Sequence, residues 1–273
     1  MTTESASMPT RSNGAIPLSL AVRLIQKSLG SIAAVAILLV AWYVSSFFLP
    51  EYIFPGLGKT AEKLHAILSD QRTYLSIAVT LQRILGGFFL SALFGVCLGL
   101  LIAAHRATHA VLMPWLKIVS GIPALTWVLL SIIWFKSAEF RVWFITFVLV
   151  FPIVAINTFD GVRSVPAELH QMVQSLHPTK STLLRLLIVP AAMPFIFTGL
   201  RVSLSFGGRI AVFAEALSAS SGIGAEMYAM NQTFDTAGIM VWTALLIAVL
   251  TLMDVLLSRL ERHWFRWRTE ITN

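Results

Sequence analysis

Charged residues are scarce in this sequence, and their scarcity argues against a globular domain surrounded by water. Asp, Glu, Lys and Arg make up 12% of the 273 residues, whereas a soluble domain carries about 25%. Cysteine is scarcer still, because Cys97 is the only one and lies inside an apolar run. A disulfide framework and a cysteine metal site are therefore excluded. The six histidines follow no metal-site spacing and no nucleophile stands beside a base, so nothing indicates an enzyme.

Long apolar runs dominate the sequence instead. Hydrophobic residues make up 57% of the chain, and the mean hydropathy is +0.80. A helix needs about 20 apolar residues to cross a bilayer, and unpaired backbone groups exclude open strands from lipid. Since the runs are continuous and do not alternate, we predict an all-α polytopic membrane protein. The six expected spans are residues 29–49, 76–103, 111–135, 142–159, 186–218 and 239–257, the third interrupted by Gly121 and Pro123.

The distribution of Lys and Arg predicts the orientation of the chain. These residues gather before the first span, between the fourth and fifth, and after the sixth, whereas residues 210–258 contain none. Because cytoplasmic loops carry the excess of Lys and Arg, we expect both termini and the loop at about 160–185 in the cytoplasm. The tails 1–28 and 259–273 would then flank a transmembrane domain 29–258. The net charge of +7 does not indicate nucleic-acid binding, since the cations stand at span ends.

The loop between the fourth and fifth spans carries a helical pattern of its own. Pro166 suits the first turn of a helix, and Glu168 in that turn favours the positive end of the helix dipole. Apolar residues repeat at helical spacing from Leu169 to Leu176, and Pro178 ends the pattern. We expect a short helix that lies flat at the membrane surface. An ordinary connecting loop is the alternative interpretation.

Several motifs resemble one family of membrane proteins, the permeases of ABC importers. QMVQSLH at 171–177 and LIVP at 187–190 are similar to its cytoplasmic coupling loop, and PAAMPFIFTGLR follows as in the family. IPALTWVLLSIIWF at 122–135 and AEAL with SGIG at 214–224 resemble the nitrate, sulfonate, taurine and bicarbonate branch. The chain departs from the pattern at Gln171, where the family has Glu, at His177, where it has Gly, and at Val128, where the branch has Pro.

The resemblance implies a six-helix type I importer permease in a bacterial inner membrane. It implies a homodimer with two ATP-binding ABC subunits and an external substrate-binding protein. ATP and Mg would be bound by the ATPase partner, because GLGKT at 56–60 has Ile53 where a P-loop needs Gly, and no cofactor is expected in this chain. The residues expected to couple to the ATPase are Glu168, Leu169, Gln171, Met172, Gln174, Ser175, Leu176 and His177.

Charged residues inside the apolar runs are candidates for the translocation path, since they are costly at membrane depth. Arg209 and Glu215 stand about 9 Å apart along a helix, too far for a simple pair, so each needs a partner elsewhere. Arg209 is expected to border the path and favour an anion, or else to form an interhelical ion pair. Pro123 and Trp127 are expected in the path wall, or else in a Pro-broken helix packed with aromatics. Arg83, Arg201 and Asp254 are expected near the membrane interfaces.

Besides a membrane scaffold without transport, against which the clustered polar and Pro-broken segments argue, two functions remain open from the sequence. The first is the permease of an ATP-driven importer for a small solute, which the branch resemblance suggests is an anion. The second is a secondary carrier or channel that acts alone. Such carriers are typically built from inverted repeats, and no convincing internal repeat is visible here.

Overall fold

The computed structural model describes residues 33–34, 36–37, 39–175, 179–183 and 187–264, and the chain divides into two units, residues 1–58 and 59–273. In the first unit, a helix spans Leu39–Phe48. Trp42 fastens the following turn to this helix, because its Nε1–H donates to the Pro55 carbonyl at 3.0 Å and its ring meets Phe54 edge-on. The first expected span begins outside the described residues, so its length stays a prediction.

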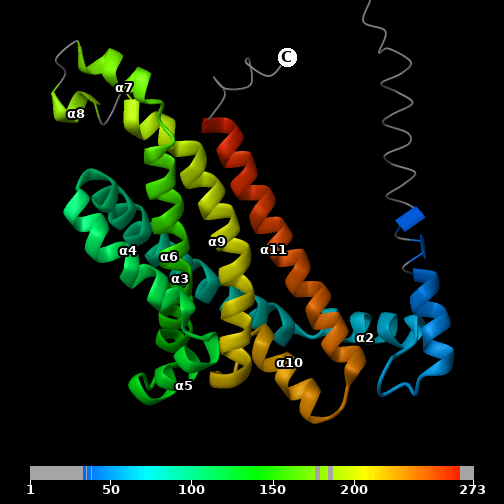
Figure 1. The fold of residues 1–273 in the computed structure, drawn as a ribbon. Helices are drawn as coiled ribbons and strands as arrows, with labels where there is room; N and C mark the ends of the chain where they lie inside the picture. The colour runs from blue at the N-terminus through cyan, green and yellow to red at the C-terminus, as the bar shows by residue number, and fades with distance from the viewer. Residues whose placement is uncertain (1–32, 35, 38, 176–178, 184–186, 265–273) are drawn as a thin grey trace, which may run out of the picture. The chain divides into compact units, whose positions relative to one another are not determined.

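From α2 onward, every regular element among the described residues is a helix (Figure 1). The elements are α2 (Leu57–Ser69), α3 (Gln71–Ala104), α4 (Arg106–Gly121), α5 (Ala124–Trp134), α6 (Ala138–Arg163), α7 (Ala167–Gln174), α8 (Lys180–Leu183), α9 (Val189–Ser218), α10 (Ile223–Gln232) and α11 (Thr236–Trp264). The helix α2 buries only Ile67.

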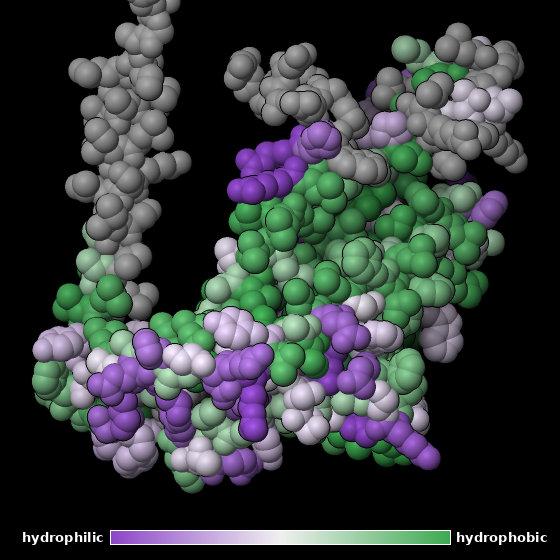
Figure 2. All heavy atoms as spheres, turned by 180° about the vertical axis from the view of Figure 1, so that it is seen from behind, coloured by the Kyte–Doolittle hydropathy of each residue, from purple (hydrophilic) through white to green (hydrophobic). Residues whose placement is uncertain are grey.

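Four helices, α3, α6, α9 and α11, are long and apolar enough to cross a membrane. The shortest, α6, has 26 residues and so extends about 39 Å, more than the roughly 30 Å of a hydrocarbon core. The helices α3, α6 and α11 contain the expected spans 76–103, 142–159 and 239–257. The helix α9 contains the expected span 186–218 from residue 189 onward. Figure 2 shows the apolar surface of the second unit as a green band between more polar ends.

The third expected span is not one straight helix. Residues 111–135 fall on α4 and α5, which are bent by 91° at their junction. Pro123 explains the break, because it has no N–H to donate and lies in the extended region at φ −58° and ψ 138°. A proline also disfavours helical backbone in the preceding residue, and Ile122 has ψ 129°. This bent pair is a broken span or a re-entrant loop, so the described residues hold four spans, or five with it.

Small residues let α3 approach α6 closely. Gly87, Ser91, Gly95 and Gly99 repeat every fourth residue and are all buried, which places them on one face. At Gly99, an added Cβ would lie 2.6 Å from Thr158 Cβ and just as near the Ala155 carbonyl. Packing at such short range is the usual source of helix association in membranes, where the solvent is itself apolar.

The connections lie at two opposite ends of the second unit (Figure 1). The helices α7 and α8 join α6 to α9 at one end, and α10 joins α9 to α11 at the other. The C-terminal end of α11 lies at the end of α7 and α8 (Figure 1). This arrangement agrees with the charge pattern, which assigns the α6–α9 connection and the C-terminal tail to one side of the membrane.

Candidate functional site

Helix α7 is the segment on which the sequence predicts the coupling contacts. Its N-cap is Pro166, in the extended region at φ −57° and ψ 138°, and the exposed Glu168 lies in the first turn. The last turn is closed by Ser175, whose N–H donates to the Gln171 carbonyl at 3.0 Å and whose hydroxyl donates to the Met172 carbonyl at 2.7 Å. The eight-residue helix α7 thus begins directly after Pro166, as the pattern indicated, and ends at Gln174, before the end that the pattern set at Pro178.

Three of the described side chains of α7 are exposed to solvent, and Val173 is half-buried. Gln171 is exposed, and Met172 has 64% of its surface exposed. A large apolar side chain on a short polar helix that covers no core is available to a partner. The structure does not describe the remaining coupling candidates, namely residues Leu176 and His177 and the side chains of Leu169 and Gln174.

Glu215, one of the expected path residues, lies instead in a buried ion pair at the other end of α9. Its Oε1 accepts a hydrogen bond from Arg83 Nη1 at 3.0 Å, and its Oε2 accepts from Thr80 Oγ1 at 2.8 Å and from the Gly224 N–H at 3.1 Å. The side chains of Glu215 and Arg83 are 0% and 1% exposed. A buried pair persists only where such additional hydrogen bonds offset the loss of hydration.

Arg83 extends this network to two further segments. Its Nη1 donates to the Ser221 carbonyl at 2.6 Å, and its Nη2 donates to Ser221 Oγ at 3.2 Å. The same Nη2 donates to Glu139 Oε1 at 3.0 Å, and the other oxygen of Glu139 accepts from Ser137 Oγ at 2.5 Å. The network, which we call the Arg83–Glu215 cluster, therefore joins α3, the start of α6, α9 and the α9–α10 connection.

The start of α10 is shaped to reach this cluster. Gly222 has φ 106°, a conformation that side chains disfavour. The next N–H group, that of Ile223, donates to Thr80 Oγ1 at 2.7 Å. Gly224 packs directly on α9, because an added Cβ would collide with the Val212 carbonyl and lie 2.7 Å from Glu215 Cβ. The SGIG motif thus places one backbone donor against Glu215 and another against Thr80.

Sequence reasoning misjudged Arg83, which was expected near an interface with its charge in water. It is fully buried, because segments of α6, α9 and the α9–α10 connection pack around it. Its partners there lie 56, 132 and 138 residues away in the chain, so the local sequence did not reveal them. Thr80 and Arg83 stand three residues apart and so share a face of α3. That pair was the local signal for a buried polar site, but it could not identify the partner carboxylate.

Arg209 lies on a different face of α9. Six residues at 3.6 per turn rotate a side chain by about 120° from its starting direction, so Arg209 faces away from the Arg83–Glu215 cluster. It is exposed, and its Nε–H donates to the Ser205 carbonyl at 3.1 Å. Among the described residues it forms no ion pair. It lines a cavity of about 560 Å³ between α9 and α11, together with Ser205, Thr243, Leu246, Ile247, Leu250, Thr251 and Asp254.

The small residues beside Arg209 serve contacts within this chain. A Cβ at Gly208 would collide with Leu250 of α11, and one at Gly207 would lie 3.0 Å from Val150 of α6. Neighbouring helices therefore approach both glycines closely. The helices come from the same chain.

Pro123 and Trp127 lie at the bend between α4 and α5. Pro123 is exposed, whereas Trp127 packs edge-on against Phe144 with ring centroids 6.0 Å apart. Trp134 contacts the same Phe144 ring. Trp127 also packs against the core cluster that contains Val128, Ala211 and Ala214. The structure therefore shows an aromatic packing contact at Trp127, and it does not gather Pro123, Trp127, Arg209 and Glu215 into one site.

Arg201 and Asp254, expected to extend separately to the interfaces, bind each other. Arg201 Nε and Nη2 donate to the two carboxylate oxygens of Asp254, both at 3.0 Å. The Nη1 of Arg201 lies 3.6 Å from Glu261. This bidentate ion pair joins the middle of α9 to α11. Arg209 is then the cation of α9 that has no carboxylate partner among the described residues.

The comparisons with known proteins identify the family of this fold. The model of the family "Binding-protein-dependent transport system inner membrane component" matches residues 95–266, more than half of the chain. The chain belongs to this family. It is therefore a multi-pass inner-membrane permease of a binding-protein-dependent ABC importer, a complex that includes ATPase subunits and a binding protein. The permease family is not catalytic, as the sequence indicated.

Relatives with curated functions agree with the expected branch. The taurine transport system permease protein of Escherichia coli is 28% identical over 88% of this chain and 90% of its own length. The bicarbonate transport system permease protein of Synechococcus elongatus is 28% identical over 72% of this chain and 71% of its own length. Among solved structures, the chain is similar to one from the inward-facing MetNI methionine ABC transporter. The match covers 67% of this chain and 93% of the other chain at 16% identity, and its TM-score of 0.58 shows a shared fold.

Proposed function

We propose that this permease couples ATP hydrolysis in two partner ATPase subunits to the import of a small anionic solute, and that it works as a homodimer. The observation that carries the coupling is the exposed helix α7, which joins two membrane-spanning helices. Three residues connect α6 to α7, so a force on α7 reaches α6 directly, and it reaches α9 through the segment that contains α8. Tilting of these helices would switch the path between outward and inward access, with ATP and Mg held by the partner.

The orientation follows from the charge pattern together with the fold. With α7, α8 and the end of α11 at the cytoplasmic face, the Arg83–Glu215 cluster and α10 lie at the outer face. An external binding protein would deliver its solute there. In this arrangement the residues expected to meet the ATPase remain Glu168, Leu169, Gln171, Met172, Gln174, Ser175, Leu176 and His177.

An assembly experiment tests the coupling helix. The tagged chain is purified from its native membrane in mild detergent, and the ATPase subunit that accompanies it is identified and quantified. We expect Met172→Asp to lower its recovery by about tenfold or more, because a charge replaces an apolar anchor at a protein interface. Thr182→Asp on the neighbouring helix α8, where Thr182 is also exposed, is the matched control and should retain the subunit. Equal recovery with both variants would remove α7 from the interface, and a chain that never carries an ATPase would favour the autonomous carrier.

Arg209 supports an anionic solute. It lies nine residues before the end of α9, about 14 Å along the helix, and it lines a cavity together with hydroxyl groups of Ser205, Thr243 and Thr251. A charge that faced lipid at this depth would be costly. A water-filled path against a second copy of the chain provides the environment that the guanidinium needs.

Transport measurements test this role of Arg209. In proteoliposomes that contain the assembled importer, Arg209→Gln should lower uptake of the anion that its binding protein delivers by about tenfold, the loss expected of one charge-assisted contact. Arg209→Lys should retain part of the activity, since the charge is kept. Unchanged uptake by Arg209→Gln would contradict the path assignment, whereas equal losses in both variants would indicate a structural role.

A further inference from the structure

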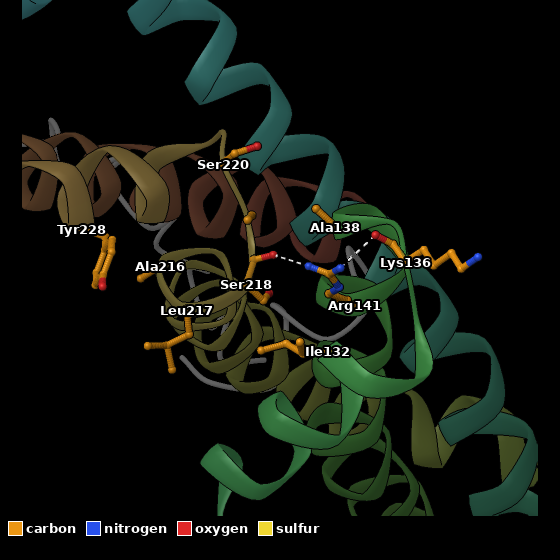
Figure 3. A pocket seen from close by; sticks show the side chains of 10 residues that line it. Ile132, Lys136, Ala138, Arg141, Ala216, Leu217, Ser218, Ser220 and Tyr228 are labelled. Carbon is orange, nitrogen blue, oxygen red and sulfur yellow. Dashed lines mark hydrogen bonds between the residues drawn. The ribbon is translucent and has the colours of Figure 1, made fainter.

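A second cavity lies at the C-terminal end of α9, at the proposed outer face. It has a volume of about 560 Å³ and is bounded by the α5–α6 connection and the α9–α10 connection (Figure 3). Cavities of this size accommodate small organic molecules. These two connections also hold Ser137 and Ser221 of the Arg83–Glu215 cluster, and Glu139 of the same cluster lies in the first turn of α6. The cavity is therefore anchored on both sides.

Arg141 is the central polar residue of this cavity. Its Nε donates to the Phe135 carbonyl at 2.7 Å, its Nη1 to the Ser218 carbonyl at 2.7 Å and its Nη2 to the Lys136 carbonyl at 2.9 Å. Figure 3 shows the guanidinium held between the last two of these carbonyls. A guanidinium has five N–H groups, so two donors remain after these three bonds. The contacts thus fix the position of the charge without neutralising it.

No carboxylate lines the cavity among the described residues that bound it. Glu139 is the acidic residue next to Arg141 in sequence, and its two oxygens are occupied by Arg83 and Ser137. Lys136 adds a second positive charge at the rim, with its side chain extending away from Arg141 (Figure 3). Lys136, Arg141 and Arg83 together carry three positive charges against the two negative charges of Glu139 and Glu215, so the net charge around the cavity is positive.

The remaining walls indicate what kind of anion fits. Ser220 and Tyr228 provide hydroxyl groups, and Ile132 and Leu217 provide apolar surface. A molecule with a charged oxygen-bearing head and a short apolar part satisfies both kinds of wall. We propose that this cavity receives a small organic oxyanion of the alkanesulfonate or carboxylate type at the outer mouth of the permease, with Arg141 as its charged anchor. The inference rests on the proposed import of an anionic solute and adds a site and a specificity-determining residue to it.

The test measures the potential and the occupancy of the cavity without transport. In the full-length chain with Cys97→Ser, purified with whatever subunits accompany it, Ser220→Cys places a thiol on the cavity wall. Its rate of reaction is measured with a sulfonate-bearing and with a trimethylammonium-bearing methanethiosulfonate, each normalised to free cysteine. We expect the anionic reagent to be favoured. Arg141→Gln should lower the anion-to-cation rate ratio by about three- to sixfold at low ionic strength, the effect of one unit charge at roughly 8 Å in a watery cavity.

Matched variants separate charge from structure. Arg141→Lys loses the three guanidinium–carbonyl hydrogen bonds but keeps the positive charge, so it should keep most of the anion-to-cation rate ratio. Asn231→Cys, on the exposed part of α10 outside the cavity lining, should show no dependence on Arg141. A ratio that falls equally in Arg141→Gln and Arg141→Lys, or a ratio near one before any substitution at 141, would overturn the proposal.

Occupancy is tested with two probes of the same shape. Methanesulfonate should protect the thiol at position 220 in a saturable manner, whereas the neutral dimethyl sulfone should not. Protection by neither probe, or by both equally, would overturn the site. Because the assay needs no ATP, no binding protein and no uptake, it remains readable if no ATPase co-purifies. The failure of this site and the failure of the importer proposal are therefore distinguishable.

Discussion

At the scale of single residues, the burial of Arg83 and Glu215 is the most demanding feature of the molecule. Both charges lie out of contact with solvent, so their hydration is replaced by each other and by Thr80, Ser221 and Gly224. Removal of one partner leaves the other charged and buried, which costs more than the pair contributes. We infer that the cluster mainly fixes how the outer ends of α3, α6, α9 and α10 meet.

Truncation of Glu215 should therefore destabilise the protein strongly. We expect Glu215→Ala to destabilise the purified chain by about 3 kcal/mol or more, seen as a lowered thermal unfolding temperature in detergent. The double variant Arg83→Leu with Glu215→Leu should lose less stability than the two single variants lose together, because it leaves neither of these two charges buried without its partner. Glu62→Ala, at an exposed position of α2, serves as the control. A loss below about 1 kcal/mol for Glu215→Ala would show that water reaches Arg83.

At the scale of elements, α2 is fastened to the start of α11 by an ion pair between Lys63 and Asp235. Burial raises the pKa of the Asp235 carboxyl, but the hydrogen bond from Lys63, the Gly238 N–H at 2.9 Å and the charges of Lys63 and Lys59 outweigh it. The pKa of Asp235 thus lies below its ordinary value. This carboxylate also accepts the hydrogen bond that begins α11, so the pair orders two elements together.

The lowered pKa of Asp235 predicts a loss of stability in acid. The ion pair contributes fully above the unfolded pKa of Asp, about 3.9, and its contribution disappears as the pH falls through the lower pKa of the folded chain. Because both side chains are partly exposed, we expect at most about 1 kcal/mol. Unfolding temperatures between pH 6 and pH 3 would measure it. Asp235→Asn should abolish this part of the acid sensitivity, and an unchanged pH profile in that variant would contradict the assignment.

At the scale of the whole molecule, the two ends of the second unit differ in chemistry. One carries α7 and the end of α11, and the other carries α2, α10 and the Arg141 cavity (Figure 1). The excess of Lys and Arg predicts that the first end is cytoplasmic. The outer assignment of the Arg141 cavity depends on this orientation.

Labelling from one side of the membrane tests the orientation. In a Cys97→Ser background, a membrane-impermeant maleimide added to intact cells should label Glu62→Cys and leave Gln171→Cys unlabelled, although both positions are exposed. After the membrane is permeabilised, both should react. The reverse pattern would place α7 outside and would overturn the proposed contact with the ATPase.

Much of the architecture could be predicted because a bilayer selects helices by local composition. The runs at 76–103 and 142–159 each fall inside one helix, and the loop pattern after Pro166 predicted α7. Pro123 marked the interruption of the third run, yet the 91° bend was not predictable. A proline removes a hydrogen bond wherever it stands, but the angle after the break depends on what α5 packs against, here Phe144 of α6.

The candidate site was predicted less well than the fold. The sequence showed that Glu215 needed a distant partner, but it assigned Arg83 to an interface and Glu215 to the path. It gave Arg141 no role, because an arginine beside a span end is ordinarily an orientation signal.

The sequence by itself thus determined the class, the four long apolar helices and the place of α7, since hydropathy and proline act over a few neighbouring residues. Only the tertiary structure decided which charges are paired, because the carboxylate partners of Arg83 and Arg201 lie more than 50 residues away along the chain and meet them only when the helices pack.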